Sequence, residues 1–281
     1  MKIFISLASY CDELLFFTLN DCIAKAKNPQ NIFFGVVDQN DESQKEKIES
    51  LPFSKQIRYV YINKVDTYGV SWARNIVFSL LDDEEYMLQI DSHTLFEKNW
   101  DETLLNQHAE LLKISKKPII STYPYGFTID DDGKPVYKEH SKAWVLELRP
   151  HPDTKLKEHD AVLRFRAEHK KSTTPINGCH MAGGFIFTTT NFIEEVPYDP
   201  YLYFHGEEQS LSIRAYTRGW DIYHPAWIPL YHHYKQSGTS YTTHHWHKDI
   251  QNKRSLNYSY LKQRANKRIR RLFYEDGMKG G

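Results

Sequence analysis

EYMLQIDSH, residues 85–93, joins a short apolar run to a carboxylate and an imidazole. Residues i and i+2 of an extended backbone point the same way, so Asp91 and His93 are expected to hold one cation from a strand end. An oxygen ligand beside an imidazole suits Mn²⁺ or another borderline divalent metal better than Ca²⁺. The alternative is that Asp91 only caps the turn after the strand.

Strand-like and helix-like segments alternate on both sides of this stretch. Short β-rich runs predict strands at residues 2–8, 31–37, 57–62, 86–90 and from 119. Helical spacing of apolar residues predicts helices at residues 12–27, 42–50, 70–81 and 100–112. This alternation predicts an α/β fold whose central sheet is mostly parallel, with right-handed crossovers.

Polar residues follow three of the predicted strands. They are Ser9-Tyr10, Asp38-Gln39 and Asp91-Ser92-His93. Ligands of parallel sheets bind beyond the carboxyl ends of the strands, which favours a nucleotide cleft at this edge over three unrelated loop starts.

The alternating pattern stops after residue 123. Residues 124–160 are rich in Asp, Gly, Pro, Lys and His, and they predict a long functional or mobile loop. Residues 161–167 alternate apolar with basic and predict an exposed strand, and residues 221–229 predict a further strand or strand pair. Gly183 and Gly184 let the backbone approach a ligand closely, although they also suit a β-bulge.

Two acidic residues and two histidines are further candidate site residues in the C-terminal part of the chain. Glu207 and Glu208 open a predicted helix that ends near residue 218. They either complement the helix dipole or position a substrate near the cation. His232 and His233 are adjacent on a predicted strand, so at most one of them faces the cation of Asp91 and His93.

The segment from residue 235 onward is basic and contains a histidine cluster around Trp246, formed by His244, His245 and His247. A solvated helix docked by one apolar edge is the favoured interpretation, and the alternative is a basic surface for an anionic acceptor, a polyanion or a membrane. The histidines also permit a zinc site, but the Cys partners of a zinc finger are missing.

Composition limits the function classes. The 281 residues contain 36 basic and 36 acidic side chains, so no net charge attracts nucleic acid or a membrane. No apolar run reaches the roughly 18 residues of a membrane span. The cysteines, Cys11, Cys22 and Cys179, are odd in number, which favours a reducing compartment. We therefore expect a cytoplasmic protein with no nucleic-acid partner.

Eight short motifs occur in a single order along the chain. They are Ala8-Ser9-Tyr10, Trp72-Ala73-Arg74, Leu88–His93, Trp100-Asp101, Ala182-Gly183-Gly184-Phe185, Glu195-Val196-Pro197-Tyr198-Asp199-Pro200, Phe204-His205-Gly206-Glu207-Glu208 and Tyr231-His232. Through this ordered set, residues 2–235 resemble the family 60 glycosyltransferases, which include a cytoplasmic hydroxyproline-directed N-acetylglucosaminyltransferase. The resemblance to the polypeptide N-acetylgalactosaminyltransferases is more distant. One departure is Cys11-Asp12, where those relatives often have Arg-Asp.

The resemblance implies a GT-A fold in residues 1–235. It does not account for residues 236–281, which are expected to form a basic, helical extension. It also implies a retaining transfer from a UDP-sugar, with UDP-N-acetylglucosamine as the expected donor, and Mn²⁺ or Mg²⁺ as cofactor. The implied metal ligands are Asp91, His93 and His232. The implied donor contacts are Ser9, Tyr10, Asp38, Gln39, Arg74, Asp91, Ser92, Gly183, Gly184 and Phe185, and Glu207 and Glu208 are the implied catalytic residues.

The implied chemistry leaves several alternatives open. Retention needs either front-face attack with acceptor and donor held close, or a carboxylate nucleophile, for which Glu207 and Glu208 are the candidates. The acceptor is expected to be a hydroxyl of a protein or glycan. Rival hypotheses are a different UDP-sugar used to build a surface polysaccharide, a non-catalytic nucleotide- or carbohydrate-binding module, and a metal-dependent hydrolase that uses the histidines at 244–247.

Overall fold

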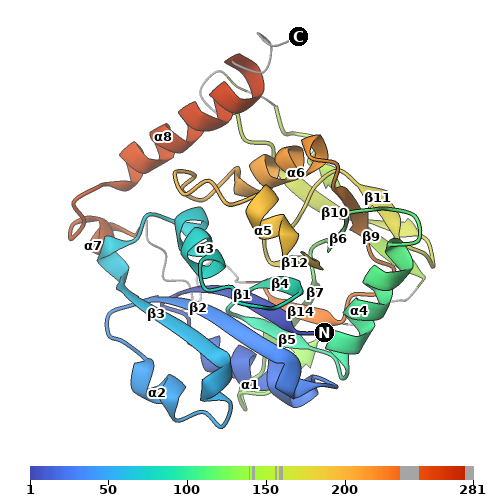
Figure 1. Ribbon diagram of the computed structural model, residues 1–281. Coiled ribbons are helices and arrows are strands. Elements are labelled where there is room, and N and C mark those ends of the chain that lie inside the picture. Colours follow the sequence, from blue (N-terminus) through green and yellow to red (C-terminus); the bar gives the residue numbers. More distant parts are fainter. Residues whose placement is uncertain (139, 141–142, 156, 158–160, 235–246, 276–281) are drawn as a thin grey trace.

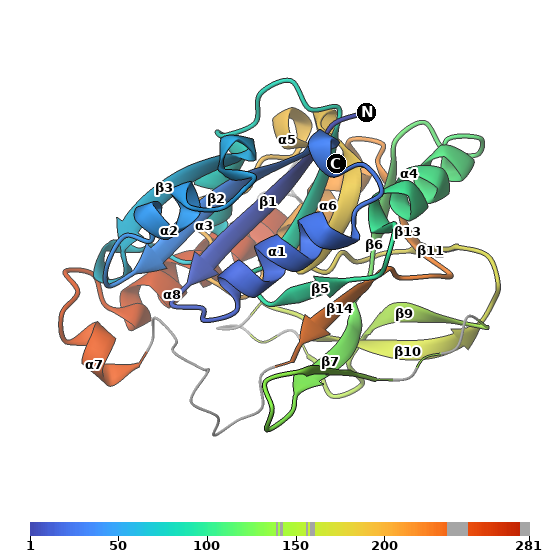
Figure 2. The same cartoon turned by 90° about the horizontal axis from the view of Figure 1, so that it is seen from below.

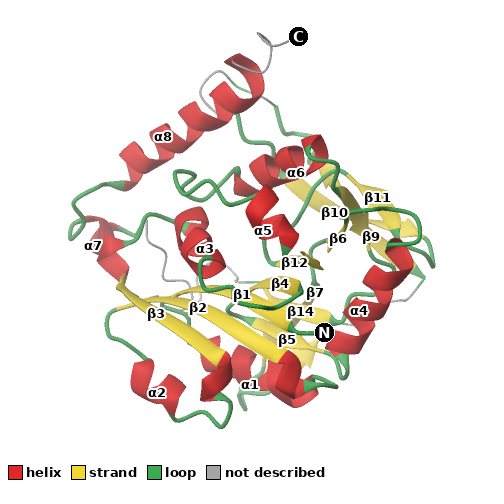
Figure 3. Ribbon diagram, viewed as in Figure 1, coloured by secondary structure: helices red, strands yellow, loops and turns green. Residues whose placement is uncertain are grey.

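A large mixed sheet forms the centre of the molecule (Figures 1 and 3). The computed structural model describes residues 1–138, 140, 143–155, 157, 161–234 and 247–275 of the chain. The sheet has eight strands in the order β11-β13-β6-β12-β4-β1-β2-β3. These strands are β1 (Ile3–Tyr10), β2 (Ile32–Asn40), β3 (Ile57–Asn63), β4 (Tyr86–Asp91), β6 (Pro118–Ser121), β11 (Ile176–Gly178), β12 (Phe185–Thr189) and β13 (Asp221–His224).

The parallel part of the sheet is the part that the sequence pattern predicted. β4, β1, β2 and β3 are consecutive parallel neighbours. β12 is antiparallel to both β4 and β6, and β6 is parallel to β13. The carboxyl ends of β1, β2 and β4 therefore meet at one edge of the sheet, as expected for a ligand site.

Helices cover both faces of the sheet (Figure 1). α1 (Leu15–Lys25), α2 (Lys45–Glu49) and α4 (Trp100–Leu111) pack on one face, and α3 (Val70–Phe78), α5 (Asn191–Glu195) and α6 (Glu207–Thr217) pack on the other. Side chains of a strand alternate between faces. In β1, Ile3, Ile5 and Leu7 accordingly join the first apolar core, whereas Phe4 joins the second.

Two smaller sheets lie beside the large one (Figure 2). The first has the order β5-β14-β7-β8, and the second pairs β9 with β10. Their strands are β5 (Thr94–Phe96), β7 (Tyr125–Ile129), β8 (Pro135–Tyr137), β9 (Trp144–Pro150), β10 (Phe165–Lys171) and β14 (Leu230–His233).

These sheets correct three expectations from the sequence. Residues 124–160 are not one long loop, because β7, β8 and β9 lie within them. The exposed strand is β10, which begins at Phe165 rather than at residue 161. The segment at 221–229 forms only β13, at residues 221–224, and the next strand, β14, begins at Leu230. β14 pairs with β5 and β7, which are both far away in sequence, so local periodicity carries little information about this pairing.

Several short turns and helices complete the structure. Single 3₁₀ turns occur at Pro29–Asn31, Ser54–Gln56 and Lys64–Asp66. The C-terminal part contains α7 (Lys248–Gln251), α8 (Tyr258–Arg270) and a π-helical turn at Arg271–Glu275. None of the helices that the structure describes has the length and apolar character needed to cross a membrane.

α8 docks on the rest of the chain by one apolar edge. Leu261, Ala265 and Ile269 are buried and follow one another at four-residue spacing. They pack with Leu202 and Tyr203. The docked, basic helix matches the favoured interpretation of this segment, whereas His244, His245 and Trp246 lie outside the described residues.

Candidate functional site

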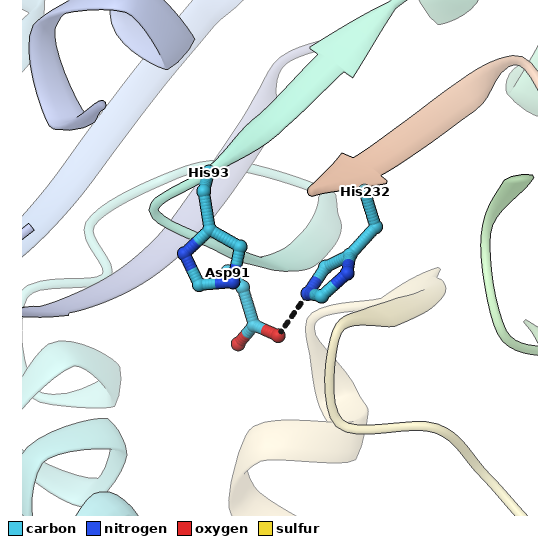
Figure 4. A group of neighbouring side chains, drawn as sticks. All are labelled: Asp91, His93 and His232. Atoms are coloured by element: carbon cyan, nitrogen blue, oxygen red, sulfur yellow. Dashed lines mark hydrogen bonds and ion pairs between the residues drawn. The ribbon is translucent and has the colours of Figure 1, made fainter. Parts of the chain in front are cut away.

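Asp91, His93 and His232 form a compact cluster at the carboxyl end of β4 (Figure 4). One ligand atom of each side chain lies within 4.8 Å of the others. The Oδ2 atom of Asp91 is 3.1 Å from the Nε2 atom of His232. The rings of His93 and His232 meet edge to face, with 4.6 Å between their centroids. A carboxylate oxygen with two imidazoles is a donor set that suits a first-row divalent metal.

Strand pairing brings His232 to this position. β14 is antiparallel to β5, with His232 opposite Thr94, and the N–H of His233 donates to the carbonyl of His93 at 3.0 Å. Because alternate residues of a strand face opposite ways, the ring of His233 instead contacts Phe127. His93 itself lies in the turn between β4 and β5, so this turn, rather than an extended strand, brings it beside Asp91.

Asp12 orients His93. Its Oδ2 atom lies 2.6 Å from Nδ1 of His93 and accepts a second hydrogen bond, at 2.8 Å, from the hydroxyl of Ser92. A carboxylate only accepts hydrogen bonds, so Nδ1 of His93 carries the proton and its Nε2 presents a lone pair. Asp12 is a site residue that was not predicted from the sequence, although its place directly after β1, at the same sheet edge as Asp91, is a usable signal.

Arg74 connects the cluster to α6. Its guanidinium donates to Oδ1 of Asp91 at 2.9 Å and to Oε1 of Glu207 at 3.1 Å. Desolvation opposes ionisation of Asp91, but the hydrogen bond from His232 and the charge of Arg74 outweigh it, so the pKa of Asp91 lies well below its ordinary value. Burial also lowers the pKa of His232 and favours the neutral imidazole, the form that binds metals.

Glu207 and Glu208 stand at the start of α6 and have different surroundings. Burial, and then the charge of Glu208, raises the pKa of Glu207, which Arg74 only partly offsets. The Oε1 atom of Glu208 accepts from the N–H of Gly183 at 2.7 Å. Glu208 is thereby fixed against the backbone that leads into β12.

A cavity of about 360 Å³ opens beside this cluster, and we call it the central cavity. Its walls include six of the residues that were predicted as site residues. These are Arg74, Asp91, Gly183, Gly184, Glu207 and Glu208. A volume of this order is typical of small-molecule sites.

The two glycines keep the cavity open. A Cβ atom on Gly184 would lie 2.8 Å from Oδ2 of Asp91, and one on Gly183 would meet the guanidinium of Arg74. Any larger residue would therefore displace the charged side chains of the site.

The chain matches the model of a protein family described as "Glycosyltransferase (GlcNAc)" over residues 2–54 and 40–279. The chain belongs to this glycosyltransferase family. The match extends past residue 235 and so includes α8.

Solved glycosyltransferase structures share the fold. A crystal structure of GalNAc-T7 with UDP, GalNAc and Mn²⁺ superposes with a TM-score of 0.61 at 17% identity, over 86% of this chain and 46% of that chain. The S. aureus TarS 1–349 complex with UDP-GlcNAc gives 0.50 at 15% identity, over 100% of this chain and 76% of that chain. No curated protein sequence matched the chain. The likeness confirms the predicted GT-A architecture of this family member.

The other predicted donor contacts lie at the ends of β1 and β2. Ser9 is opposite Asp38, and Tyr10 is opposite Gln39, in the parallel register of these strands. The amide of Gln39 donates to the carbonyl of Ser9 at 2.9 Å. Within the described part of the chain, the hydroxyl of Ser9 and Oδ1 of Asp38 are buried without a hydrogen-bond partner.

Two predicted donor contacts face away from the central cavity. The hydroxyl of Ser92 points to Asp12, as described above. The ring of Phe185 is fully buried in the apolar core together with Leu88 and Phe187. In this glycosyltransferase Ser92 and Phe185 therefore support the site from behind, and the surface at β12 is provided by Gly183 and Gly184.

Proposed function

We propose that this protein is a metal-dependent, retaining glycosyltransferase of the family 60 type, which transfers N-acetylglucosamine from UDP-N-acetylglucosamine to a hydroxyl of a protein or glycan. The observation that carries the proposal is the convergence of Asp91, His93 and His232 beside the central cavity. The family described as "Glycosyltransferase (GlcNAc)" and the presence of UDP-GlcNAc in the TarS complex support the choice of donor. The three free cysteines are consistent with our proposal that it works in the cytoplasm.

The cluster would hold Mn²⁺ or Mg²⁺. The Nε2 atom of His93 and the carboxylate of Asp91 are the ligands that the surrounding hydrogen bonds prepare, and His232 is the third. The Mn²⁺ in the GalNAc-T7 structure supports a metal of this kind. When bound, the cation offsets the negative charge of the leaving diphosphate as a Lewis acid.

The residues of the chain supply position and charge. Arg74 remains cationic beside Asp91 and adds a second positive group at the end of the cavity where the diphosphate is expected. The backbone of Gly183 and Gly184 lets the sugar lie close to Asp91, and Glu208 is placed to accept a hydrogen bond from a sugar hydroxyl. The ends of β1 and β2, with Ser9, Tyr10, Asp38 and Gln39, would border the uridine.

Front-face attack accounts for retention better than a covalent intermediate. Glu207 has a raised pKa, and its Oε1 atom accepts a hydrogen bond from Arg74; both features make this carboxyl group a poor nucleophile. Glu208 already accepts a hydrogen bond from Gly183. We propose that both glutamates position the donor and acceptor, which then react at short range without an enzyme nucleophile.

A second donor has a specific observation in its favour, because the GalNAc-T7 structure contains GalNAc. Glucosamine and galactosamine derivatives differ only in the configuration at C4 of the sugar. A panel of UDP-GlcNAc, UDP-GalNAc, UDP-Glc and UDP-Gal, assayed for UDP release and for transfer, separates these donors.

The decisive experiment compares the protein with Asp91→Asn. We expect the unmodified protein to bind UDP and to transfer the sugar only when Mn²⁺ is present. In Asp91→Asn, UDP affinity and transfer rate should each fall by more than about 100-fold. A loss of this size exceeds the range for residues that only orient a metal ligand. Asp132→Asn, at an exposed turn, controls for the loss of a carboxylate. Undiminished transfer by a folded Asp91→Asn protein would refute the metal assignment. UDP binding without turnover on any acceptor or water would support a non-catalytic module instead.

A further inference from the structure

A second cavity, of about 480 Å³, is lined by residues of α8 together with residues 153–155, 157, 162, 164 and 203–205, and we call it the α8 cavity. Four residues line both this cavity and the central cavity. They are Val162, Arg164, Phe204 and His205. The two spaces are therefore neighbours across a shared wall, and a molecule that reaches Glu207 and Glu208 can extend toward α8.

Cations outnumber carboxylates among the described residues of the α8 cavity. Lys155, Lys157, Arg164 and Lys262 line it, and Asp153 is the one carboxylate among the lining residues that the structure describes. Asp153 is itself 3.5 Å from the ring of His151. None of the four cations has a carboxylate within ion-pair distance in the described part of the chain. Because the whole chain has no net charge, this is a local excess that attracts an anion.

Aromatic rings form the apolar part of the same cavity. Tyr203 and Tyr258 meet edge to face, with 5.5 Å between their centroids, and Phe204 lies next to Tyr203 in the chain. Lys262 lies over the ring of Tyr258, 5.8 Å from its centroid. Aromatic side chains combine a large apolar surface with a fixed shape. The aromatic rings of this cavity provide flat surfaces on which the C–H faces of sugar rings can stack. The neighbouring lysine and arginine side chains can bind an anionic substituent of the same sugar.

The kind of cation favours a saccharide over a peptide. Three of the four are lysines, which act as compact point charges and meet a phosphate or carboxylate from many directions. Acidic and phosphorylated peptides are usually bound by clusters of arginine, because the planar guanidinium donates two parallel hydrogen bonds to one carboxylate or phosphate group. The volume, within the usual range of ligand sites, suits one or two sugar units.

We propose that the α8 cavity is an acceptor subsite that binds an anionic saccharide chain, whose charged group is a phosphodiester or a carboxylate. The proposal rests on the proposed glycosyltransferase function, since the acceptor hydroxyl must reach the central cavity. The chain would enter along α8, pass Phe204 and His205, and present its hydroxyl near Glu208. Lys155 and Lys262, which both line the cavity, hold its charge.

The first test is direct binding. Calorimetric titrations of the full chain, with UDP and Mn²⁺ present, use four probes: an oligo(glycerol phosphate), an oligogalacturonate, a neutral oligosaccharide of equal length and an oligoglutamate peptide. We expect one of the two anionic saccharides to bind best, and which of them does so identifies the charged group. Equal or tighter binding of the peptide, or no preference over the neutral chain, would overturn the proposal.

Charge reversal on α8 locates the binding. Lys262→Glu should weaken binding of the preferred saccharide by about tenfold or more, because it replaces an attraction by a repulsion at short range. Lys155→Glu, at another residue that lines the cavity, is a second variant with the same expected loss. Lys267→Glu is the matched control, because Lys267 lies on the same helix but lines a different cavity beside Tyr201. Equal losses in the control variant would contradict the assignment.

UDP binding separates the two proposals. The variants at Lys155, Lys262 and Lys267 should bind UDP as tightly as the parent chain, because none of these residues lines the central cavity. In transfer assays, Lys262→Glu should raise the KM for the anionic acceptor and leave kcat unchanged. If the parent chain binds no UDP, the glycosyltransferase proposal fails. If UDP binding is intact and saccharide binding is unaffected by charge reversal, only the subsite proposal fails.

Discussion

The Oδ2 atom of Asp12 lies 2.6 Å from Nδ1 of His93, although the two residues are 81 positions apart in the sequence. The contact fixes the tautomer and the ring plane of His93, so that Nε2 is directed at the cluster with Asp91. The geometry of the candidate metal site therefore depends on Asp12, which is not one of the three candidate ligands.

Replacing Asp12 with Asn should weaken Mn²⁺ binding by about 10- to 100-fold, because the amide no longer enforces the tautomer of His93. The measurement is the Mn²⁺ concentration that gives half-maximal UDP binding. Saturating Mn²⁺ should restore much of the activity, which distinguishes Asp12 from the ligands themselves. An unchanged Mn²⁺ requirement would show that Asp12 has no part in the site.

A methyl group at Gly184 should block donor binding. The new Cβ would lie 2.8 Å from Oδ2 of Asp91, so the carboxylate must move or the backbone must shift. We expect Gly184→Ala to lose most UDP-sugar binding and transfer. Gly126→Ala is a matched control, because its Cβ would also lie 2.8 Å from its neighbour, but this neighbour is Cδ of the flexible Lys138. Similar activity in the two variants would contradict the role of Gly184.

The raised pKa of Glu207 has a consequence for stability. The folded chain retains a proton on Glu207 at pH values where the unfolded chain, with an ordinary pKa of about 4.3, has lost it. The free energy of unfolding therefore decreases as the pH rises above about 4.3 and until the folded-state pKa is passed. Glu207→Gln removes the pH-dependent contribution of this carboxyl group to the free energy of unfolding.

Thermal melts from about pH 5 to about pH 9 measure this effect. The Tm difference between Glu207→Gln and the parent chain should shift in favour of the variant as the pH rises. Glu102→Gln, at an exposed position of α4, controls for the loss of one negative charge. A Tm difference for Glu207→Gln that is the same at every pH would mean that Glu207 does not retain a proton in the folded chain.

Ile269 of α8 should be important for stability. Its side chain is fully buried and packs with Leu202 and Tyr203. Truncation to Ala should lower the free energy of unfolding by about 2–5 kcal/mol, the range for buried large-to-small changes. Ile114→Ala is the control, since Ile114 is 72% exposed and should tolerate the change. Denaturant melts of both variants provide the measurement, and equal midpoints would contradict the packing.

The N-terminal half of the fold could be predicted because its signals are local. Buried strands such as β1 are short apolar runs, and helices such as α1 have apolar residues at helical spacing. The alternation of these two patterns implies the parallel sheet. The strands β7, β8 and β9 could not be predicted in this way. They are short and partly exposed, and β7 also pairs with the distant β14, so their stability depends on packing that the local sequence does not reveal.

The site was predictable to a similar degree. The position of Asp91 at a strand end followed from the pattern, and His93 followed from its spacing, although a turn rather than a strand presents it. Nothing local identified His232 as the third member, and only the ordered resemblance to known glycosyltransferases did so. The contact of Asp12 with His93 depends on two strand ends meeting at one sheet edge, and it was missed for that reason.

Gly206 has a left-handed backbone, with φ of 92°, and it allows Ile269 to pack directly against the chain where α6 begins. The residue that completes the support of Glu207 and Glu208 is therefore translated long after the glutamates themselves. A nascent chain that has released α6 but not α8 from the ribosome has β1, β2, β4 and β12 available but not this support. The enzyme should thus acquire activity late in synthesis, when α8 has emerged and docked, and not when the last strand of the large sheet forms.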